Sequence, residues 1–113
     1  MGIDGLRVLS STVFGHRYRL ELLAALSCAR DGEGVCLKFL ADKCGAPSSV
    51  YYPSLKSLLS AGLIARFART KRNRWVLYGR KPSPVWTGVQ VMMEDLEVEI
   101  DFRDVVRAWP EAS

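Results

Sequence analysis

The feature that most constrains this chain is a single change of hydrophobic period, which falls at Gly62. Before Gly62, apolar residues recur three and four positions apart, which is the spacing of amphipathic helices. After it, residues 64–70 (IARFART) and 74–80 (RWVLYGR) flank a short KRN tip and have the aromatic and β-branched composition of a half-buried β-hairpin. A chain of 113 residues is one domain of ordinary size, so both kinds of element share one core. The pattern predicts an α+β fold that is mostly helical.

The helical part is divided by glycine turns. Helices are predicted within residues 6–14 and 16–30, and the turn cluster DGEG at 31–34 ends the second. A short helix over 37–44 stops at Gly45, a position that suits the left-handed residue found after many helices. The helix that follows has apolar residues at i, i+4, i+7 and i+8, namely Tyr51, Leu55, Leu58 and Leu59.

A last helix is predicted after the sequence PSP, because Ser83 suits the N-cap and Pro84 the first helical position. A two-heptad apolar seam follows it, made of Trp86, Val89, Met93, Leu96 and Ile100. Such a seam favours a partner helix, so these five residues form the predicted dimer interface. Residues 96–102 (LEVEIDF) also alternate as a strand would, so the helix is predicted through Leu96 and its continuation stays open. A short helical turn that packs Val105 is expected near the end.

Charge is distributed unevenly along the chain. Residues 1–93 contain 14 Lys or Arg and 5 Asp or Glu, a net +9, whereas residues 94–113 contain 2 and 7, a net −5. The basic density peaks in residues 66–81, which contain no acid. A clustered positive field attracts polyanions, nucleic acid first among them, although a plain solvated basic surface is the alternative. The acidic end is interpreted as a solvated face, a region that keeps DNA away, or a surface for a basic partner.

A short helix, a glycine turn, a longer helix ending in Ala-Gly-Leu and a basic hairpin together make a winged helix-turn-helix with extra N- and C-terminal helices. The chain resembles the bacterial ArsR-type (arsenic-repressor-like) transcriptional regulators, and more distantly the MarR-type. The resemblance runs from VFGHRYRLELLAAL (13–26) through LADKCGAPSSVYYPSLKSLLSAGLIARFARTKRNRWVLY (40–78). It implies a homodimeric repressor whose second short helix reads the major groove and whose two-stranded wing contacts the backbone or minor groove. A bacterial cytoplasmic location, at the nucleoid when bound to DNA, is expected by default.

The residues of the recognition helix indicate which side faces outward. If Tyr51 turns to the core, the outer stripe carries serine hydroxyls, Tyr52 and Lys56, which suit phosphates and base edges. The predicted DNA contacts of this helix are Ser48, Ser49, Tyr51, Tyr52, Ser54 and Lys56. Those of the wing are Arg66, Arg69, Lys71, Arg72, Asn73 and Arg74. The alternative for Tyr51 and Tyr52 is that both rings pack into the core.

Pro53 departs from the polar or basic residue that is usual at this place in the family. Proline well inside a helix destabilises it by about 3 kcal/mol, but the effect largely vanishes in the first turn. Either regular helix therefore starts near Tyr51, or residues 48–52 form a loose turn before it.

Metal and enzyme functions are not predicted. Cys36 lies where the family often begins a Cys-x-Cys metal site, but Lys38 replaces the second thiolate. Cys28 and Cys44 are expected to act as small hydrophobic residues, and the single histidine, His16, excludes His-rich zinc sites. An enzyme is not expected, because the chain has no glycine-rich phosphate loop and its single histidine does not favour a catalytic triad. No cofactor is expected. No apolar run reaches the roughly 20 residues that cross a bilayer, and the N-terminus does not resemble a signal peptide.

These observations predict a single domain over residues 1–113, with a DNA-binding core at about 16–81 and a C-terminal dimerisation helix at about 84–109. The predicted function is sequence-specific binding of double-stranded DNA by a transcription regulator that acts as a homodimer. A small-molecule or protein effector stays open. The alternative is a winged-helix module that binds a partner protein and lacks sequence-specific DNA binding.

Overall fold

The computed structural model describes residues 1–67 and 75–108. Its elements, in chain order, are α1 (Ile3–Phe14), α2 (Arg19–Cys28), β1 (Glu33–Cys36), α3 (Leu37–Cys44), a 3₁₀ turn η1 (Ser48–Tyr51), α4 (Tyr52–Ser60), β2 (Ile64–Phe67), β3 (Leu77–Arg80), α5 (Pro84–Asp95), a second 3₁₀ turn η2 (Phe102–Val105) and β4 (Val106–Ala108). The α+β fold predicted from the sequence is confirmed. Within the described ranges, no helix has both the length and the apolar character needed to span a bilayer.

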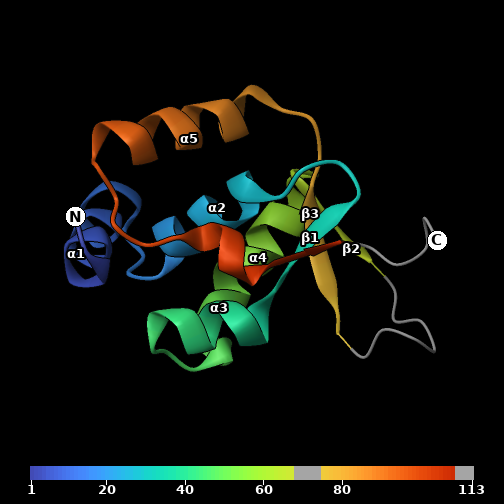
Figure 1. Cartoon of the computed structure of the whole chain (residues 1–113), viewed down its shortest axis with the longest axis horizontal. Coiled ribbons are helices and arrows are strands. Elements are labelled where there is room, and N and C mark those ends of the chain that lie inside the picture. The colour runs from blue at the N-terminus through green and yellow to red at the C-terminus, as the bar shows by residue number, and fades with distance from the viewer. Residues whose placement is uncertain (68–74, 109–113) are drawn as a thin grey trace.

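The strands form one antiparallel sheet in the order β2-β3-β1-β4 (Figure 1). The predicted hairpin is its β2–β3 half, in which Ile64 pairs with Arg80 and Phe67 with Leu77. Two strands were not predicted. β1 pairs with both β3 and β4 and begins at Glu33, so the second half of the predicted DGEG turn belongs to a central strand.

Glycines allow the sheet to pack closely at its centre. A Cβ atom on Gly79 would lie 2.7 Å from Cζ of Phe67 and 3.0 Å from the carbonyl oxygen of Glu33. A Cβ atom on Gly34 would lie 2.9 Å from Cβ of Leu77. The Phe67 ring therefore covers a patch of sheet that only glycines leave open.

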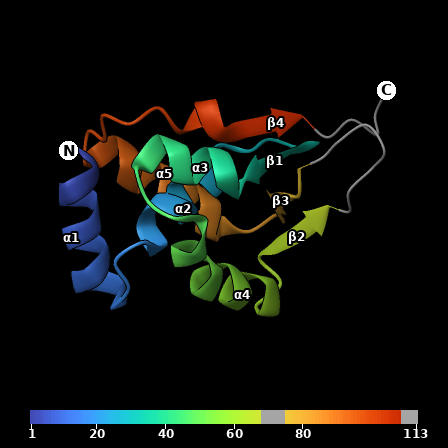
Figure 2. The ribbon, with the colours of Figure 1, turned by 90° about the horizontal axis from the view of Figure 1, so that it is seen from below.

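Helix α2 is the centre of the core. Every residue from Leu20 to Ser27 is buried, which is the pattern of a helix covered on all sides. Figures 1 and 2 show α2 enclosed by α1, α3 and α5. The one charged residue in this buried run is Glu21, which is 1% exposed.

The recognition element begins with a 3₁₀ turn. Residues 48–51 form η1, and α4 begins at Tyr52, so that Pro53 lies in the first turn of α4. Each of the two alternatives predicted for Pro53 holds in part, because regular helix starts next to Tyr51 and residues 48–51 form a turn before it. A proline in the first turn of a helix needs no backbone hydrogen bond. Gly45 and Gly62 have the left-handed φ values of 68° and 74° that end α3 and α4.

Helix α5 begins where the sequence predicts and ends next to the predicted Leu96, but it does not continue over the predicted dimerisation helix of about 84–109. The Ser83 hydroxyl accepts a hydrogen bond from the Val85 backbone N–H at 3.2 Å, and the helix ends at Asp95 with Leu96 as its C-cap. Neither a continued helix nor a strand follows over residues 97–101. The predicted final turn is η2, which buries Val105 and leads into β4.

The segment of η2 and β4 is tied to the rest of the protein by ion pairs. Arg103 donates from Nη1 to Oε1 of Glu33 at 2.8 Å and to the carbonyl oxygen of Cys28 at 2.6 Å, and Lys43 pairs with Asp104. The Arg103 guanidinium, helped by the backbone N–H of Arg30, lowers the pKa of Glu33 to about 2. Glu33 is thus ionised at neutral pH and holds β1 against the C-terminal segment.

Candidate nucleic-acid interface

A groove lies between the start of α4 and the β2–β3 hairpin. Its volume is about 510 Å³, and among the residues that line it are Lys38, Ser48, Tyr52, Arg66 and Trp75. We call this surface the α4–β2 groove. In Figure 2, α4 and β2 lie next to each other along the lower side of the molecule. The start of the recognition helix and the first strand of the hairpin thus share one surface that combines hydroxyls, aromatic rings and two cations.

Several of the predicted recognition residues face solvent. Tyr52 is 51% exposed, and Ser49 and Lys56 are exposed, whereas Ser48 is half-buried and lines the groove. Pro53 is exposed beside Tyr52. These side chains present short hydroxyls, a phenol and an ammonium group, which are donors suited to phosphate oxygens and base edges.

Two members of the predicted contact set are buried instead. Tyr51 is 0% exposed and donates from its hydroxyl to Oε2 of Glu21 at 2.6 Å. Ser54 is 1% exposed, and its Oγ accepts a hydrogen bond from Nε of Arg19 at 3.1 Å. The structure therefore corrects the prediction for these two residues, which help to hold the helix in place. The helical spacing contained the signal, because Ser54 lies three positions after Tyr51 and four before the core residue Leu58.

The wing is described only in part. Arg66 lies in β2, is exposed and lines the groove. The other predicted wing contacts, Arg69, Lys71, Arg72, Asn73 and Arg74, lie outside the described residues.

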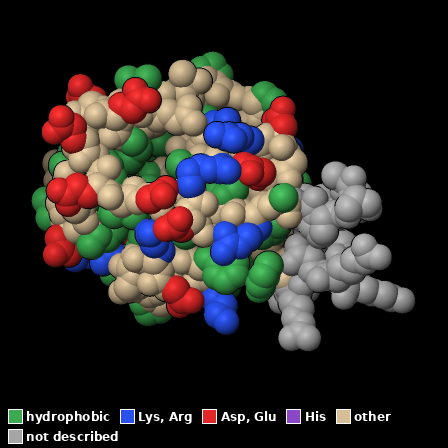
Figure 3. All heavy atoms as spheres, viewed as in Figure 1, with side chains coloured by type: hydrophobic (Ala, Val, Ile, Leu, Met, Phe, Trp, Pro, Cys, Tyr) green, Lys and Arg blue, Asp and Glu red, His purple; other side chains and the backbone are tan. Residues whose placement is uncertain are grey.

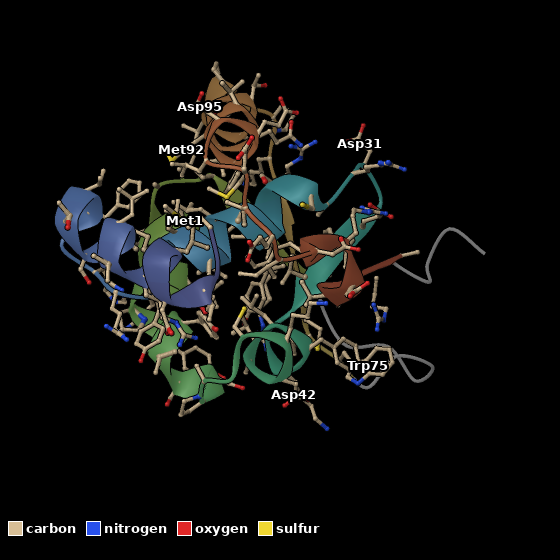
Figure 4. All side chains as sticks on the ribbon, turned by 60° about the vertical axis from the view of Figure 1, so that its left-hand side comes forward. Met1, Asp31, Asp42, Trp75, Met92 and Asp95 are labelled. Carbon is tan, nitrogen blue, oxygen red and sulfur yellow. The ribbon has the colours of Figure 1, made fainter. Side chains whose placement is uncertain are left out.

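An aromatic stack that the sequence did not predict supports one wall of the groove. The rings of Phe39 and Trp75 meet edge to face with centroids 4.9 Å apart, and the guanidinium carbon of Arg107 lies 4.4 Å from the Phe39 centroid. Figure 4 shows Trp75 beside α3, and its side chain is 41% exposed. The stack joins α3, β4 and the chain just before β3, so it holds an exposed indole in the groove that Tyr52 also lines.

A buried polar network lies behind the recognition element. Arg7 of α1 donates from Nε to Oε1 of Glu21 at 2.8 Å and from Nη2 to the carbonyl oxygen of Cys44 at 2.7 Å. Glu21 also accepts the Tyr51 hydroxyl. We call Arg7, Glu21 and Tyr51 the buried triad. Burial, and then Glu21 itself, raise the pKa of Tyr51, so the phenol stays protonated and donates. A lone glutamate in the apolar run LELLAAL was the sequence signal for such a network.

The predicted seam on α5 meets its partner helix within the same chain. Trp86 and Val89 are 2% and 5% exposed and pack into the core formed around α2. These two side chains are therefore unavailable to a second copy, which corrects their assignment to a dimer interface. Met93, Leu96 and Ile100 are half-buried.

The three cysteines are thiols. Cys36 and Cys44 are buried and Cys28 is half-buried. Burial raises the pKa of Cys28, and it raises that of Cys44 to about 12, so both stay protonated at neutral pH. In the described parts of the chain, no three His, Cys, Asp or Glu side chains are grouped as a metal site would require.

Comparison with known proteins identifies solved structures with a similar fold. No protein family model and no curated protein matches the chain. Among solved structures, the transcriptional regulator BldR from Sulfolobus solfataricus has 18% identity and a TM-score of 0.57, over 84% of this chain and 68% of that one. A MarR-family regulator from Rhodococcus sp. RHA1 has 18% identity and a TM-score of 0.57, over 84% and 67%. Reduced HlyU from Vibrio cholerae has 18% identity and a TM-score of 0.55, over 80% and 86%. The fold is that of winged-helix regulators.

Proposed function

We propose that this chain is a transcription regulator that binds double-stranded DNA in a sequence-specific manner. The observation that carries the proposal is the α4–β2 groove, where an exposed helix start and a basic hairpin strand form one surface. The fold that the chain shares with known regulators supports the proposal. The motifs within residues 13–78 favour the ArsR type of regulator. The DNA-binding core is then residues 16–81, approximately, and the location is the bacterial cytoplasm.

The distribution of charge supports one orientation on DNA. Figure 3 shows acidic side chains gathered at the left, over the C-terminal end of α5 and the segment after it. The α4–β2 groove, with Lys38 and Arg66, lies away from this acidic end. In the proposed complex, Tyr52 and Ser49 enter the major groove, and Lys56 and Arg66 neutralise phosphates.

The test is the salt dependence of DNA affinity, measured on duplexes selected from a random pool. Each lost phosphate contact reduces the slope of log K against log salt by about 0.9, so Lys56→Ala/Arg66→Ala is expected to reduce it by up to about 1.8. Arg30→Ala, which removes an exposed cation next to Asp31 and far from Trp75 (Figure 4), is the control and should leave the slope unchanged. Equal slopes for wild type and both variants would contradict the proposed face.

The competing function is a protein-interaction module, for which the acidic end of α5 offers a surface. Such a module predicts no preference for any duplex over random competitor DNA and weak retention on heparin. A selected two-fold symmetric sequence would exclude it.

We further infer that the protein acts as a homodimer through apolar side chains left exposed on α1 and α5. Val8 and Val13 of α1 are 62% and 59% exposed, and Val85 and Val91 of α5 are 43% and 59% exposed. The N-terminal helix and the C-terminal end of α5 are adjacent in Figures 1 and 2. Large apolar side chains left exposed on two adjacent helices support a protein interface there.

Sedimentation velocity tests the dimer. The variant Val8→Glu/Val91→Glu places a charge on each helix and is expected to shift the protein from dimer to monomer. Ser60→Glu adds a charge at the exposed end of α4 and should leave the dimer intact. A wild-type protein that sediments as a monomer at high concentration, or a valine variant that stays dimeric, would contradict this interface.

A further inference from the structure

A pocket on the side of α2 and α5 is separate from the α4–β2 groove. It lies between α2, α5 and the segment 97–102, and its volume is about 470 Å³. Figure 3 shows it as a hollow with hydrophobic side chains inside and acidic side chains around it. A volume of this size lies within the range of about 300 to 1,000 Å³ that is typical of small-molecule sites.

Apolar side chains form part of the inner wall of the pocket. Ala24 of α2, Met93 of α5, and Val98 and Phe102 of the returning segment line it. One polar interaction spans it, in which Nε2 of Gln90 donates to the carbonyl oxygen of Ser27 at 2.8 Å and fixes α5 over α2. The two helices that form walls of the pocket are therefore held in a fixed position relative to each other.

The rim of the pocket is negative. Glu94, Glu97 and Asp101 line it and are exposed, and no described Lys or Arg is among the lining residues. None of these three carboxylates takes part in a salt bridge within the described parts of the chain. Asp101 accepts a hydrogen bond from the backbone N–H of Arg103, a neutral donor. The guanidinium of Arg103 is engaged by Glu33. The N-terminal ammonium of Met1 donates to the carbonyl oxygen of Glu97 at 2.8 Å, but the three carboxylates outnumber this cation, so the net charge at the rim stays negative.

Glu97 at the rim has an uncommon backbone conformation. Its φ is 49°, which makes it the one non-glycine residue with a positive φ in the described parts of the chain. The left-handed conformation is unfavourable by about 1–2 kcal/mol for a residue with a Cβ, and glycine is the usual residue at this place after a helix. The chain therefore holds a carboxylate at the pocket rim in a backbone position where glycine would be less strained.

We propose that this pocket binds a lipophilic organic monocation, a protonated amine or quaternary ammonium group attached to an aromatic or alkyl body. The body enters the apolar interior against Met93 and Phe102, and the cationic group lies at the rim between the carboxylates. Organic anions are repelled by the same carboxylates. Burial raises the pKa of the Cys28 thiol at the pocket wall, so this thiol adds no charge to the pocket at neutral pH.

Three probes with the same body test the charge preference, namely 4-phenylbutylamine, 4-phenylbutanol and 4-phenylbutyrate. Isothermal titration calorimetry at neutral pH and low salt is expected to rank the amine first, by roughly tenfold or more over the alcohol, with the carboxylate weakest. Equal affinity for all three probes, or no amine binding up to millimolar concentration, would overturn the proposal.

Variants of Glu97 separate ligand binding from a role in folding. Glu97→Gly removes the carboxylate and relieves the left-handed backbone, so the melting temperature should be equal to or above that of wild type while the amine preference falls severalfold. Glu94→Gln/Glu97→Gln should abolish most of that preference and leave 4-phenylbutanol binding unchanged. Val98→Phe fills the pocket and should weaken both probes. Amine affinity that survives in all three variants would place the binding elsewhere and overturn the assignment.

Discussion

Replacing Glu21 with leucine is expected to lower the free energy of unfolding by about 3–5 kcal/mol, measured by urea denaturation followed by circular dichroism. Arg7 and Glu21 are 8% and 1% exposed and form a two-pronged ion pair at 2.8 and 3.2 Å. Removing the carboxylate leaves the Arg7 guanidinium buried without a counter-charge. The Tyr51 hydroxyl loses its acceptor at the same time, which adds the penalty of an unsatisfied buried donor.

The matched control removes the charges together. A buried ion pair can often be replaced by apolar side chains of similar volume with little loss, so Arg7→Met/Glu21→Leu/Tyr51→Phe is expected to recover most of the stability lost in Glu21→Leu. Recovery is incomplete because the carbonyl oxygen of Cys44 still lacks its partner. A Glu21→Leu protein as stable as wild type, or a triple variant no better than the single one, would contradict this account of the triad.

The buried triad also explains how the recognition element is held. Arg7 binds the carbonyl oxygen of Cys44 at the end of α3, and Glu21 binds Tyr51 at the end of η1. Both ends of the turn between the two short helices are therefore fixed to α1 and α2. Because α1 also carries the exposed valines of the inferred dimer face, the same arginine links that face to the proposed DNA surface.

Local sequence signals predicted the helices of the fold and the hairpin. The helix over 37–44 was predicted with the bounds that the structure gives, since Gly45 ends it with a left-handed φ. β1 and β4 were missed because they have only four and three residues and are defined by pairing with distant segments. A short strand made by long-range pairing has no period of its own to detect.

Only part of the candidate site was predicted from the sequence, because the rest depends on contacts with distant residues. Tyr52 and Lys56 are exposed as the outward stripe required, whereas Tyr51 and Ser54 are buried by polar partners 30 and 35 positions away, Glu21 and Arg19. A polar side chain on the inner face of a helix is stable when such a partner exists, and the sequence alone does not reveal it. The aromatic stack of Phe39 and Trp75 was missed because it also depends on tertiary contact.

Replacement of Trp86 tests whether the apolar side of α5 belongs to the core of one chain or to a dimer interface. Its ring is 2% exposed, and its Nε1 donates to the carbonyl oxygen of Lys81 at 2.9 Å. If Trp86 is a core residue, the substitution Trp86→Ala is expected to lower the free energy of unfolding by about 3–5 kcal/mol at every protein concentration. Trp86→Phe keeps most of the volume and loses the hydrogen bond, so the free energy of unfolding should fall by about 1–2 kcal/mol.

An interface residue behaves differently, because its replacement by alanine would weaken dimerisation and leave the unfolding of the dilute monomer unchanged. Denaturation at two protein concentrations at least a hundredfold apart decides between them, and an unchanged monomer would restore Trp86 to the dimer interface.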